Sequence, residues 1–328
     1  MTDRPLLSRL QPWHFAVAGV LVVALIVAVV LGRSPPAAKG ASATAAAGST
    51  ESSASSSGAR GAVVAANGIP KDQQNNPLWV KCNADDPNIE IFGCSAIISA
   101  NNESPQDLAV AYNDRGYAYN QTGDVNLAIS DLNRSVALDP VNAGYPYNNL
   151  GFAELASNDA NTALADFNNA VGLDPTNAGS YKGRGDAHRL QQDWPDAIAD
   201  YSRSVQIDPS DESAFVGRGR VQFVTGNLSQ ALADFSAARR IDARNEAAIM
   251  GQGQVLNAQG QYAQAIAAFT SAIALNSRDA LAWYGRSVAR LATNDAADAA
   301  TDLDEARACN PYVNASPVAQ QMAAARVP

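Results

Sequence analysis

One ten-residue stretch, YKGRGDAHRL at residues 181–190, combines several residue types that often do chemistry. Its two glycines resemble those that surround bound phosphates. Arg184, Gly185 and Asp186 form the triplet known from adhesion motifs. His188 carries the side chain that serves most often in acid–base catalysis and metal binding. Which of these residues do chemistry depends on the elements that position them.

The stretch is one unit of an internal repeat with a period of about 34 residues. One column of the repeat is small: Gly116, Gly151, Gly185, Gly219, Gly253 and Ser287. A second column is alanine: Ala128, Ala163, Ala197, Ala231, Ala265 and Ala299. A third column, four residues later, is bulky: Leu132, Phe167, Tyr201, Phe235, Phe269 and Leu303. Large side chains stand four positions before the first column: Tyr112, Tyr147, Tyr181, Phe215, Ile249 and Trp283. Proline closes four units: Pro140, Pro175, Pro209 and Pro311.

These phased columns resemble the tetratricopeptide repeat family, whose unit pairs two antiparallel helices. The similarity covers residues 109–312. It implies an all-α fold, a right-handed α-solenoid of about six helix pairs with capping helices. Apolar residues spaced three and four apart, such as Ala231, Phe235 and Ala238, support the helices. The implied repeats are 109–142, 144–177, 178–211, 212–245, 246–279 and 280–312.

In such a repeat the glycines of YKGRGDAHRL lie inside a helix. A phosphate loop needs a strand, a loop and then a helix, so nucleotide binding is disfavoured. The Arg-Gly-Asp triplet is helical too, which argues against an adhesion motif. His188 occupies the column of Tyr119 and is predicted to be a packing or groove residue, with no cluster of carboxylates, cysteines or serines beside it. Close approach of neighbouring first helices is one explanation for a second glycine column: Gly183, Gly217, Gly251 and Gly285.

Charged residues follow the same period. An arginine precedes the first column and an aspartate precedes the bulky column in four repeats, whereas the fifth repeat lacks both. These positions lie roughly opposite each other in a helix hairpin. We therefore predict partly buried, hydrogen-bonded ion pairs that hold each hairpin in register. The pairs are Arg115–Asp131, Arg184–Asp200, Arg218–Asp234 and Arg286–Asp302.

The N-terminal region differs from the repeats in composition. Residues 15–31 are uninterrupted apolar residues that, with Gly32, would form a helix about 27 Å long. They predict a transmembrane helix at 15–32, with residues 1–14 in the cytoplasm because Arg4 and Arg9 lie there. A signal peptide cleaved near Ala41-Ser42-Ala43 is the alternative. Residues 33–76 contain few large apolar side chains and predict a disordered, flexible linker.

Caps are expected at both ends of the repeats. At the front, residues 77–108 hold a lone amphipathic helix, NIEIFGCSAIISAN, onto which a Cys82–Cys94 disulfide would fasten the preceding segment. Two free thiols are the alternative. Cys309 falls in a column of leucine and isoleucine and is predicted to be a small core residue. At the back, residues 313–328 predict a C-terminal capping helix.

The charge and the resemblance together limit the function. The net charge of −9 argues against nucleic acid, and neither a cofactor nor a metal is expected. The resemblance implies a non-catalytic scaffold whose first helices line a concave groove for a peptide or a helix. Aromatic and basic anchors there favour a protein segment with an acidic group flanked by apolar residues. The residues that the resemblance places in the groove are Tyr117, Phe152, Lys182, Arg189, Arg220, Phe223 and Tyr284.

Three classes of function follow. The first is an adaptor in a bacterial inner membrane, with a single transmembrane pass and the repeats in the periplasm, where it gathers components of an envelope complex. The segment from Trp79 to Ser104 resembles the lead-in of bacterial envelope proteins with such repeats. Signal cleavage would instead release the chain into the periplasm. The second class is a self-associating structural assembly factor. An enzyme, or a regulatory subunit of one, is disfavoured because the anchor, linker, caps and repeats use the whole chain.

Overall fold

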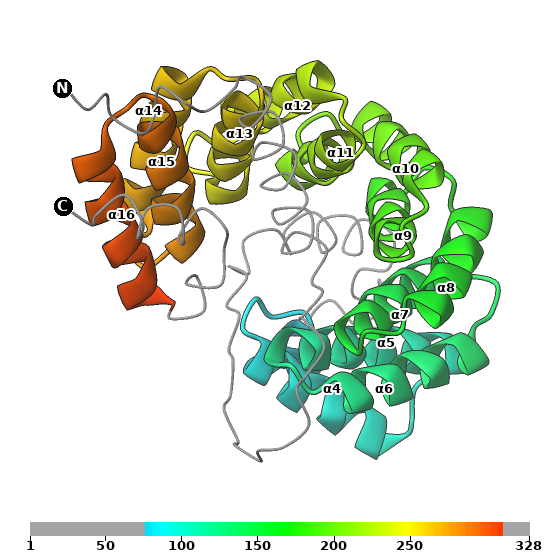
Figure 1. Ribbon diagram of the computed structural model, residues 1–328. Helices are drawn as coiled ribbons and strands as arrows, with labels where there is room; N and C mark the ends of the chain where they lie inside the picture. Colours follow the sequence, from blue (N-terminus) through cyan, green and yellow to red (C-terminus); the bar gives the residue numbers. More distant parts are fainter. Residues whose placement is uncertain (1–75, 311–328) are drawn as a thin grey trace, which may run out of the picture. The chain divides into compact units, whose positions relative to one another are not determined.

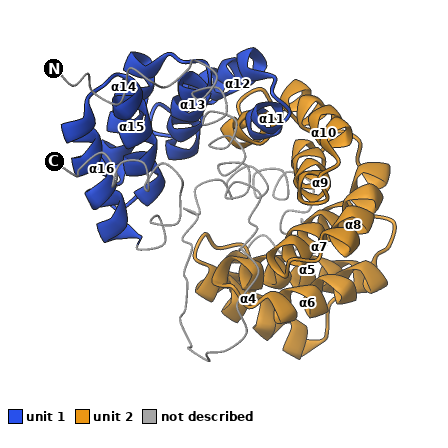
Figure 2. Ribbon diagram, viewed as in Figure 1, with its two compact units in different colours: residues 1–46, 219–328 blue, residues 47–218 orange. Residues whose placement is uncertain are grey.

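The computed structural model describes residues 76–310, which form fourteen α-helices, α3 to α16, without a strand (Figure 1). The predicted transmembrane helix and the C-terminal capping helix lie outside the described residues. None of the helices in the described range is long and apolar enough to span a bilayer. The structure divides into two compact units between Arg218 and Gly219, within α11 (Glu212–Val224) (Figure 2). We call residues 76–218 the N-terminal unit and residues 219–310 the C-terminal unit.

Each unit consists of antiparallel helix pairs in which a first helix packs against the second helix that follows it. The N-terminal unit contains α3 (Pro77–Cys82), α4 (Pro87–Ala100), α5 (Pro105–Thr122), α6 (Val125–Leu138), α7 (Gly144–Ala156), α8 (Ala160–Leu173), α9 (Ala178–Leu190), α10 (Trp194–Ile207) and the start of α11. The C-terminal unit continues with the end of α11, α12 (Leu228–Ile241), α13 (Glu246–Ala258), α14 (Tyr262–Leu275), α15 (Ala280–Ala292) and α16 (Ala296–Cys309). The first helices α5, α7 and α9 contact one another in order, as do α13 and α15. The predicted all-α stack of helix pairs is confirmed; its handedness stays a prediction.

The helix boundaries follow from local chemistry. Ser104 caps α5, because its hydroxyl accepts a hydrogen bond from the backbone N–H of Asp107 at 3.1 Å, and Pro105 occupies the first turn. The turn inside each helix pair needs one residue in the left-handed region. Glycine supplies it three times, and asparagine or glutamine supplies it otherwise: Gly123, Asn158, Gln192, Gly226, Gly260 and Asn294.

The core of the stack is built around the bulky column. The ring of Phe167 is fully buried between Gly151 in its own pair and Gly183 in the next pair. A Cβ atom at Gly151 would lie 2.7 Å from that ring, and one at Gly183 would also clash with it. The same arrangement recurs three times: Gly185, Tyr201 and Gly217; Gly219, Phe235 and Gly251; Gly253, Phe269 and Gly285.

This arrangement corrects the expected reason for the second glycine column. The groups that need the space are the aromatic rings of the preceding second helices, not neighbouring first helices. The exceptions fit the same account. In the first repeat the bulky residue is the smaller Leu132, and the second glycine position holds Asn149. In the last repeat Leu303 faces a first-column position that holds Ser287.

The N-terminal cap is a pair of helices joined by a disulfide. Cys82 in α3 and Cys94 in α4 are bonded, which confirms that prediction. Trp79 packs against this bond in a fully buried cluster. The expectation of a lone helix is wrong, because the segment before α4 is itself the short helix α3, capped by the Asn76 side chain. Gly93 lets the two helices touch, since a Cβ there would clash with the backbone at Lys81 and Cys82.

Cys309 does not lie in the core. The prediction of a small core residue is wrong, because the thiol is free and exposed at the last residue of α16. Its column lies at the end of each second helix, where the side chains are only partly covered. Leu173, Ile241 and Leu275 in the same column are also exposed. Apolar residue type alone therefore did not indicate burial at this position.

Candidate functional site

The predicted arginine–aspartate pairs are a structural feature of the repeats. Arg115 donates from Nε and Nη2 to the two carboxylate oxygens of Asp131, at 2.6 and 2.9 Å. The same two-bond pairs join Arg184 to Asp200, at 2.8 and 2.6 Å, and Arg286 to Asp302, at 2.9 and 2.7 Å. Three of the four predicted pairs are thus present. The fourth, Arg218–Asp234, joins residues on either side of the unit boundary and stays a prediction.

Each of these arginines makes a third contact with the preceding helix. Nη1 donates to a side-chain oxygen there, at 2.9 to 3.1 Å: Arg115 to Ser95, Arg184 to Asn168, Arg218 to Ser202 and Arg286 to Thr270. An aromatic residue three positions earlier covers each guanidinium: Tyr112, Tyr181, Phe215 and Trp283. The arginine column therefore ties each pair to its neighbour and is not available to a ligand.

The second repeat breaks this pattern. Leu150 occupies the arginine position, so Asp166 has no guanidinium partner and instead lies near Glu154. Burial, and secondarily the charge of Glu154, raises the pKa of Asp166 to about 6. The carboxyl group of Asp166 therefore takes up a proton as the pH falls through about 6.

The predicted groove residues of the N-terminal unit lie on adjacent first helices. Tyr117 on α5 and Phe152 on α7 occupy the same column, and each is partly exposed. The Phe152 ring meets the buried Phe167 ring edge-on, with 5.1 Å between centroids. Lys182 on α9 lies 6.0 Å from the centre of the Phe152 ring. Tyr117, Phe152 and Lys182 thus lie on three first helices that contact one another in order, and we call this set of residues the first-helix face.

The predicted basic patch is largely neutralised within the chain. The ammonium group of Lys182 pairs with Asp211 at 3.3 Å. Arg189 pairs with Asp186 at 3.5 Å, and that carboxylate also accepts a hydrogen bond from the Tyr201 hydroxyl at 2.6 Å. Burial, and then the charge of Asp186, raises the pKa of Tyr201 well above its usual range, so the hydroxyl remains a donor.

The sequence predicted a basic patch at Lys182 and Arg189 but did not identify the carboxylates that pair with them. The physical reason is that Asp211 comes from the turn before the next first helix, which a comparison of repeat columns does not reveal. Arg220 is partly buried in the C-terminal unit and makes contacts within the chain.

Two predicted aromatic anchors of the C-terminal unit are buried. Phe223 is 3% exposed and Tyr284 is 7% exposed. Tyr284 packs with Leu303 and two alanines of α16, so it belongs to the core of the last helix pair. The prediction that these two rings line an open groove is wrong, because both are buried. Partly exposed aromatic side chains of the predicted set remain only on the first-helix face.

A buried polar network, which the sequence analysis did not identify, links three first helices. Asn149 donates to Asn113 at 3.0 Å, and Asn148 donates to Asn149 at 3.3 Å. Ser180 on α9 then donates to Asn148 at 3.0 Å, and Asn113 donates to Asp114 at 3.1 Å. The network fixes α5, α7 and α9 relative to one another, so the first-helix face is a rigid surface. The adjacent asparagines 148 and 149 were the signal for it.

His188 is surrounded by carboxylates, contrary to expectation. Its Nδ1 lies 3.7 Å from Asp193 and its Nε2 lies 3.7 Å from Asp200. Asp196 completes a cluster with His188 and Asp193. The prediction that no carboxylate cluster accompanies His188 is wrong, because the turn between α9 and α10 folds the first residues of α10 back onto the end of α9.

Comparison with known families agrees with the repeat geometry. A tetratricopeptide repeat model matches residues 149–212 and 250–314, and a second one matches residues 109–142. These three segments carry tetratricopeptide repeats. Proteins with tetratricopeptide repeats generally mediate protein–protein interactions and are generally non-catalytic scaffolds. No curated protein matches the chain.

Several solved structures share the fold at low sequence identity. PilF of Pseudomonas aeruginosa is 17% identical with a TM-score of 0.60, and the match covers 68% of this chain and all of PilF. A chain of the Cut9–Hcn1 hetero-tetramer of the APC/C is 16% identical with a TM-score of 0.64, over 82% of this chain and 51% of that one. A tetratricopeptide repeat protein from Parabacteroides merdae ATCC 43184 is 14% identical with a TM-score of 0.54, and the match covers 80% of this chain and 97% of that one. At these identities the likeness concerns the fold.

Proposed function

We propose that the chain is a non-catalytic scaffold that binds a segment of a partner protein on the first-helix face of its N-terminal unit. The observation that carries this proposal is the partly exposed aromatic pair on adjacent first helices, Tyr117 and Phe152. Aromatic side chains that are already held in place lose little entropy on binding, which is why they recur at the centre of interfaces. The asparagine network beneath them supports the same role by keeping the surface rigid.

The chemistry of the face favours an apolar segment with hydrogen-bonding groups at one side. The rings of Tyr117 and Phe152 offer apolar area, and the Lys182–Asp211 pair at their edge offers both a cation and an anion. An acidic group of the partner would have to compete with Asp211 for Lys182. We therefore propose an extended or helical apolar segment for which an acidic group is not the main determinant.

Site-specific photocrosslinking in the native host tests this proposal. A benzoylphenylalanine residue at position 117 or 152 is expected to capture one discrete partner protein. The matched control is the same residue at Leu173, which is 46% exposed on the second helix α8. Identical products from positions 117, 152 and 173, or none from any of them, would remove the first-helix face as a binding surface.

A substitution series separates binding from folding. Tyr117→Ala is expected to abolish capture of the partner at position 152 without loss of helical circular dichroism, because the Tyr117 side chain is partly exposed. Phe152→Ala is less informative, since it also removes the contact with the buried Phe167 ring. Undiminished capture in the Tyr117→Ala variant would contradict the proposed role of this ring.

We also propose a location: a single pass through a bacterial inner membrane by residues 15–32, with the repeats in the periplasm. The Cys82–Cys94 disulfide supports it, because such bonds persist in oxidising compartments. Membrane fractionation before and after deletion of residues 15–32 tests the anchor. The mass of the mature chain distinguishes the anchor from a cleaved signal. Recovery of the intact chain in the cytosol would exclude both.

Self-association is the second candidate function. Exposed apolar side chains on the N-terminal cap favour it: Val80, Ile89 and Phe92, the last of which is 60% exposed. Light scattering of the purified chain is expected to show a dimer that Phe92→Asp converts to a monomer. A monomer before the substitution would leave the peptide-binding scaffold as the better account.

A further inference from the structure

The turn between α9 and α10 brings together one histidine and two aspartates. His188 lies in the last turn of α9, Asp193 is the N-cap residue immediately before α10, and Asp196 lies in the first turn of α10. Their ligand atoms all lie within 4.8 Å of one another. The Nδ1 atom of His188 faces Asp193 and is buried without a hydrogen-bond partner. A buried nitrogen with no partner beside two carboxylates is a destabilising arrangement unless a further group joins it.

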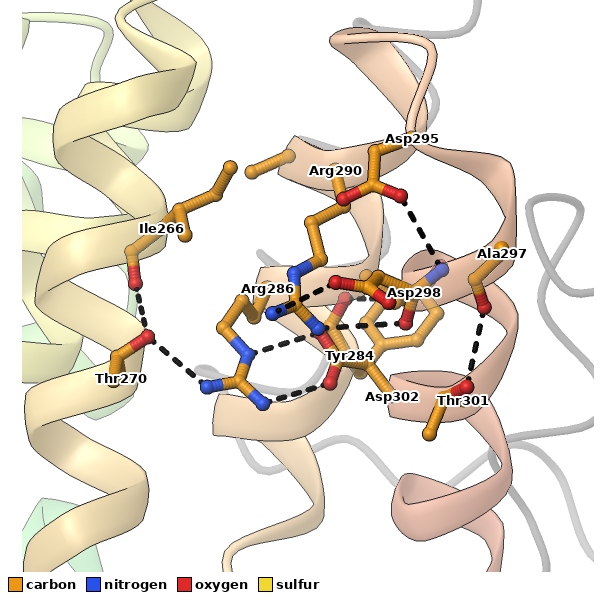
Figure 3. Close-up of polar contacts among 12 residues, drawn as sticks. Ile266, Thr270, Tyr284, Arg286, Arg290, Asp295, Ala297, Asp298, Thr301 and Asp302 are labelled. Carbon is orange, nitrogen blue, oxygen red and sulfur yellow. Dashed lines mark hydrogen bonds and ion pairs between the residues drawn. The ribbon is translucent and has the colours of Figure 1, made fainter.

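The sixth repeat shows what the same position holds elsewhere in the chain. Its equivalent aspartates are Asp295, Asp298 and Asp302, and Arg290 stands where the third repeat has His188. The guanidinium of Arg290 contacts Asp302 at 2.7 Å and Asp298 at 3.5 Å (Figure 3). In the sixth repeat, the carboxylates of Asp298 and Asp302 thus contact the positive charge of Arg290. In the third repeat the imidazole of His188 occupies the place of that guanidinium group.

The arginine nearest the cluster is committed elsewhere. All three donating nitrogens of Arg184 are used, two by Asp200 and one by Asn168, although its charge also acts on Asp196. Asp193 makes no side-chain hydrogen bond at the start of α10, whereas the equivalent Asp295 accepts one from the backbone of Asp298. The carboxylate oxygens of Asp193 and Asp196 thus remain able to bind a cation.

We propose that His188 Nδ1, Asp193 and Asp196 bind a divalent transition-metal ion, with zinc as the best match. One imidazole nitrogen and two carboxylate oxygens are ligands that zinc accepts, whereas magnesium and calcium prefer oxygen alone. Asp200 faces the other ring nitrogen at 3.7 Å, on the side where a carboxylate orients a metal-binding histidine. Three ligands leave a fourth position of a tetrahedral site for water.

Binding of the ion would require the side chains of the cluster to rotate toward it. The ligand atoms of His188, Asp193 and Asp196 now lie within 4.8 Å of one another. Bonds to zinc are roughly 2.0 to 2.2 Å long, so these atoms would have to move closer together. The Asp193 side chain is 45% exposed and can rotate without disturbing the core. A bound ion would join the two helices across a turn whose Gln192 has a positive φ of 63°. It would therefore stabilise the third repeat in proportion to its occupancy.

Zinc titration of the purified full chain tests the proposal. The background carries Cys309→Ser, because that exposed free thiol is also a metal ligand. After chelator treatment, one zinc ion per chain is expected to bind and to raise the unfolding temperature. His188→Gln and Asp193→Asn are each expected to weaken binding beyond the roughly 10- to 100-fold loss that outer-shell substitutions cause.

The matched control is Asp295→Asn, which changes the equivalent residue of the sixth repeat and is expected to leave zinc affinity unchanged. Cobalt as a probe adds a second measurement, since a tetrahedral site gives visible absorption that both third-repeat variants should lose. Absence of zinc binding in the Cys309→Ser chain would overturn the proposal. Undiminished binding in the folded His188→Gln or Asp193→Asn variants would do the same.

Discussion

Gly183 lies directly against the ring of Phe167, which belongs to the preceding helix pair, so that any side chain on the glycine would clash with the ring. The glycine thereby sets the spacing between successive pairs. Glycine inside a helix costs about 1 kcal/mol relative to alanine. A glycine recurs at this position in each pair that follows an aromatic ring of the bulky column. The apolar area that the ring buries therefore offsets the cost of glycine in the helix.

This relationship predicts that Gly183→Ala destabilises the N-terminal unit despite the better helix propensity of alanine. Overpacking against a fully buried ring is expected to cost about 1–3 kcal/mol in the free energy of unfolding. Urea denaturation followed by circular dichroism measures the change. Gly172→Ala is the matched control, because nothing lies within 4 Å of a Cβ at that helical position.

The control should be neutral or stabilising by up to about 1 kcal/mol. A second substitution tests the mechanism: Phe167→Leu should reduce the harm done by Gly183→Ala, since the first repeat combines Leu132 with Asn149 at the same positions. Equal effects of Gly183→Ala in the presence and absence of Phe167→Leu would show that the ring is not what the glycine accommodates.

Asp302 is predicted to be the most sensitive acidic residue of the C-terminal unit. Its side chain is 1% exposed and contacts both Arg286 and Arg290. Asp302→Asn leaves two guanidinium groups without their carboxylate, so we expect a loss of about 3 kcal/mol in the free energy of unfolding. Asp304→Asn is the control, since Asp304 is 56% exposed and should change stability by less than about 0.5 kcal/mol. Similar values for the two variants would contradict this assignment.

Asp166 is predicted to make stability depend on pH. Its folded pKa of about 6 exceeds the ordinary value of 3.8, so the folded chain binds this proton more tightly than the unfolded chain. The resulting stabilisation is fully present below about pH 4 and is lost as the pH rises through 6. Asp166→Asn cannot ionise and should therefore be more stable than the wild type at pH 7.5, by about 1 kcal/mol after solvent screening.

The difference between the two proteins should disappear at pH 4, which denaturation at both pH values measures. Glu154→Gln is the informative companion, because it removes the smaller of the two causes of the raised pKa. It should reduce the pH dependence without abolishing it. A stability difference for Asp166→Asn that is the same at pH 4 and 7.5 would show that the carboxyl group does not titrate as stated.

The repeat columns were sufficient to predict the helix pairs and the contact of Arg184 with Asp200, because both depend on spacing within one hairpin. The disulfide followed from two cysteines near each other in a segment expected to be oxidised. The failures concern which side chains and turns cover a given position. Lys182 pairs with Asp211 from the next turn, and Tyr284 is covered by α16. A position in a repeat does not reveal which neighbouring element covers it.

The carboxylates around His188 illustrate a signal that was present in the sequence. Aspartates 193, 196 and 200 follow His188 in the sequence. They come close to its ring only because α10 folds back on α9. A comparison with the sixth repeat, where Arg290 occupies the same column, would have identified the turn as a cation-binding position. Residue type alone did not, because aspartate is also the common residue at the start of a helix.

The last prediction concerns the thiols, all three of which lie in the described residues. A thiol reagent should detect one cysteine in the native, unreduced chain, Cys309, and three after unfolding under reducing conditions. Cys94→Ser removes the link between α3 and α4 and should lower the free energy of unfolding by about 2–3 kcal/mol, because the closed loop is short.

The loss should be confined to the N-terminal cap, which hydrogen exchange can localise to the buried cluster around Trp79. Cys309→Ser provides the control, since its thiol is exposed and unbonded and its removal should leave the unfolding transition unchanged. Three reactive thiols in the chain as isolated from its host would contradict the disulfide, and with it the oxidising compartment on which the proposed location rests.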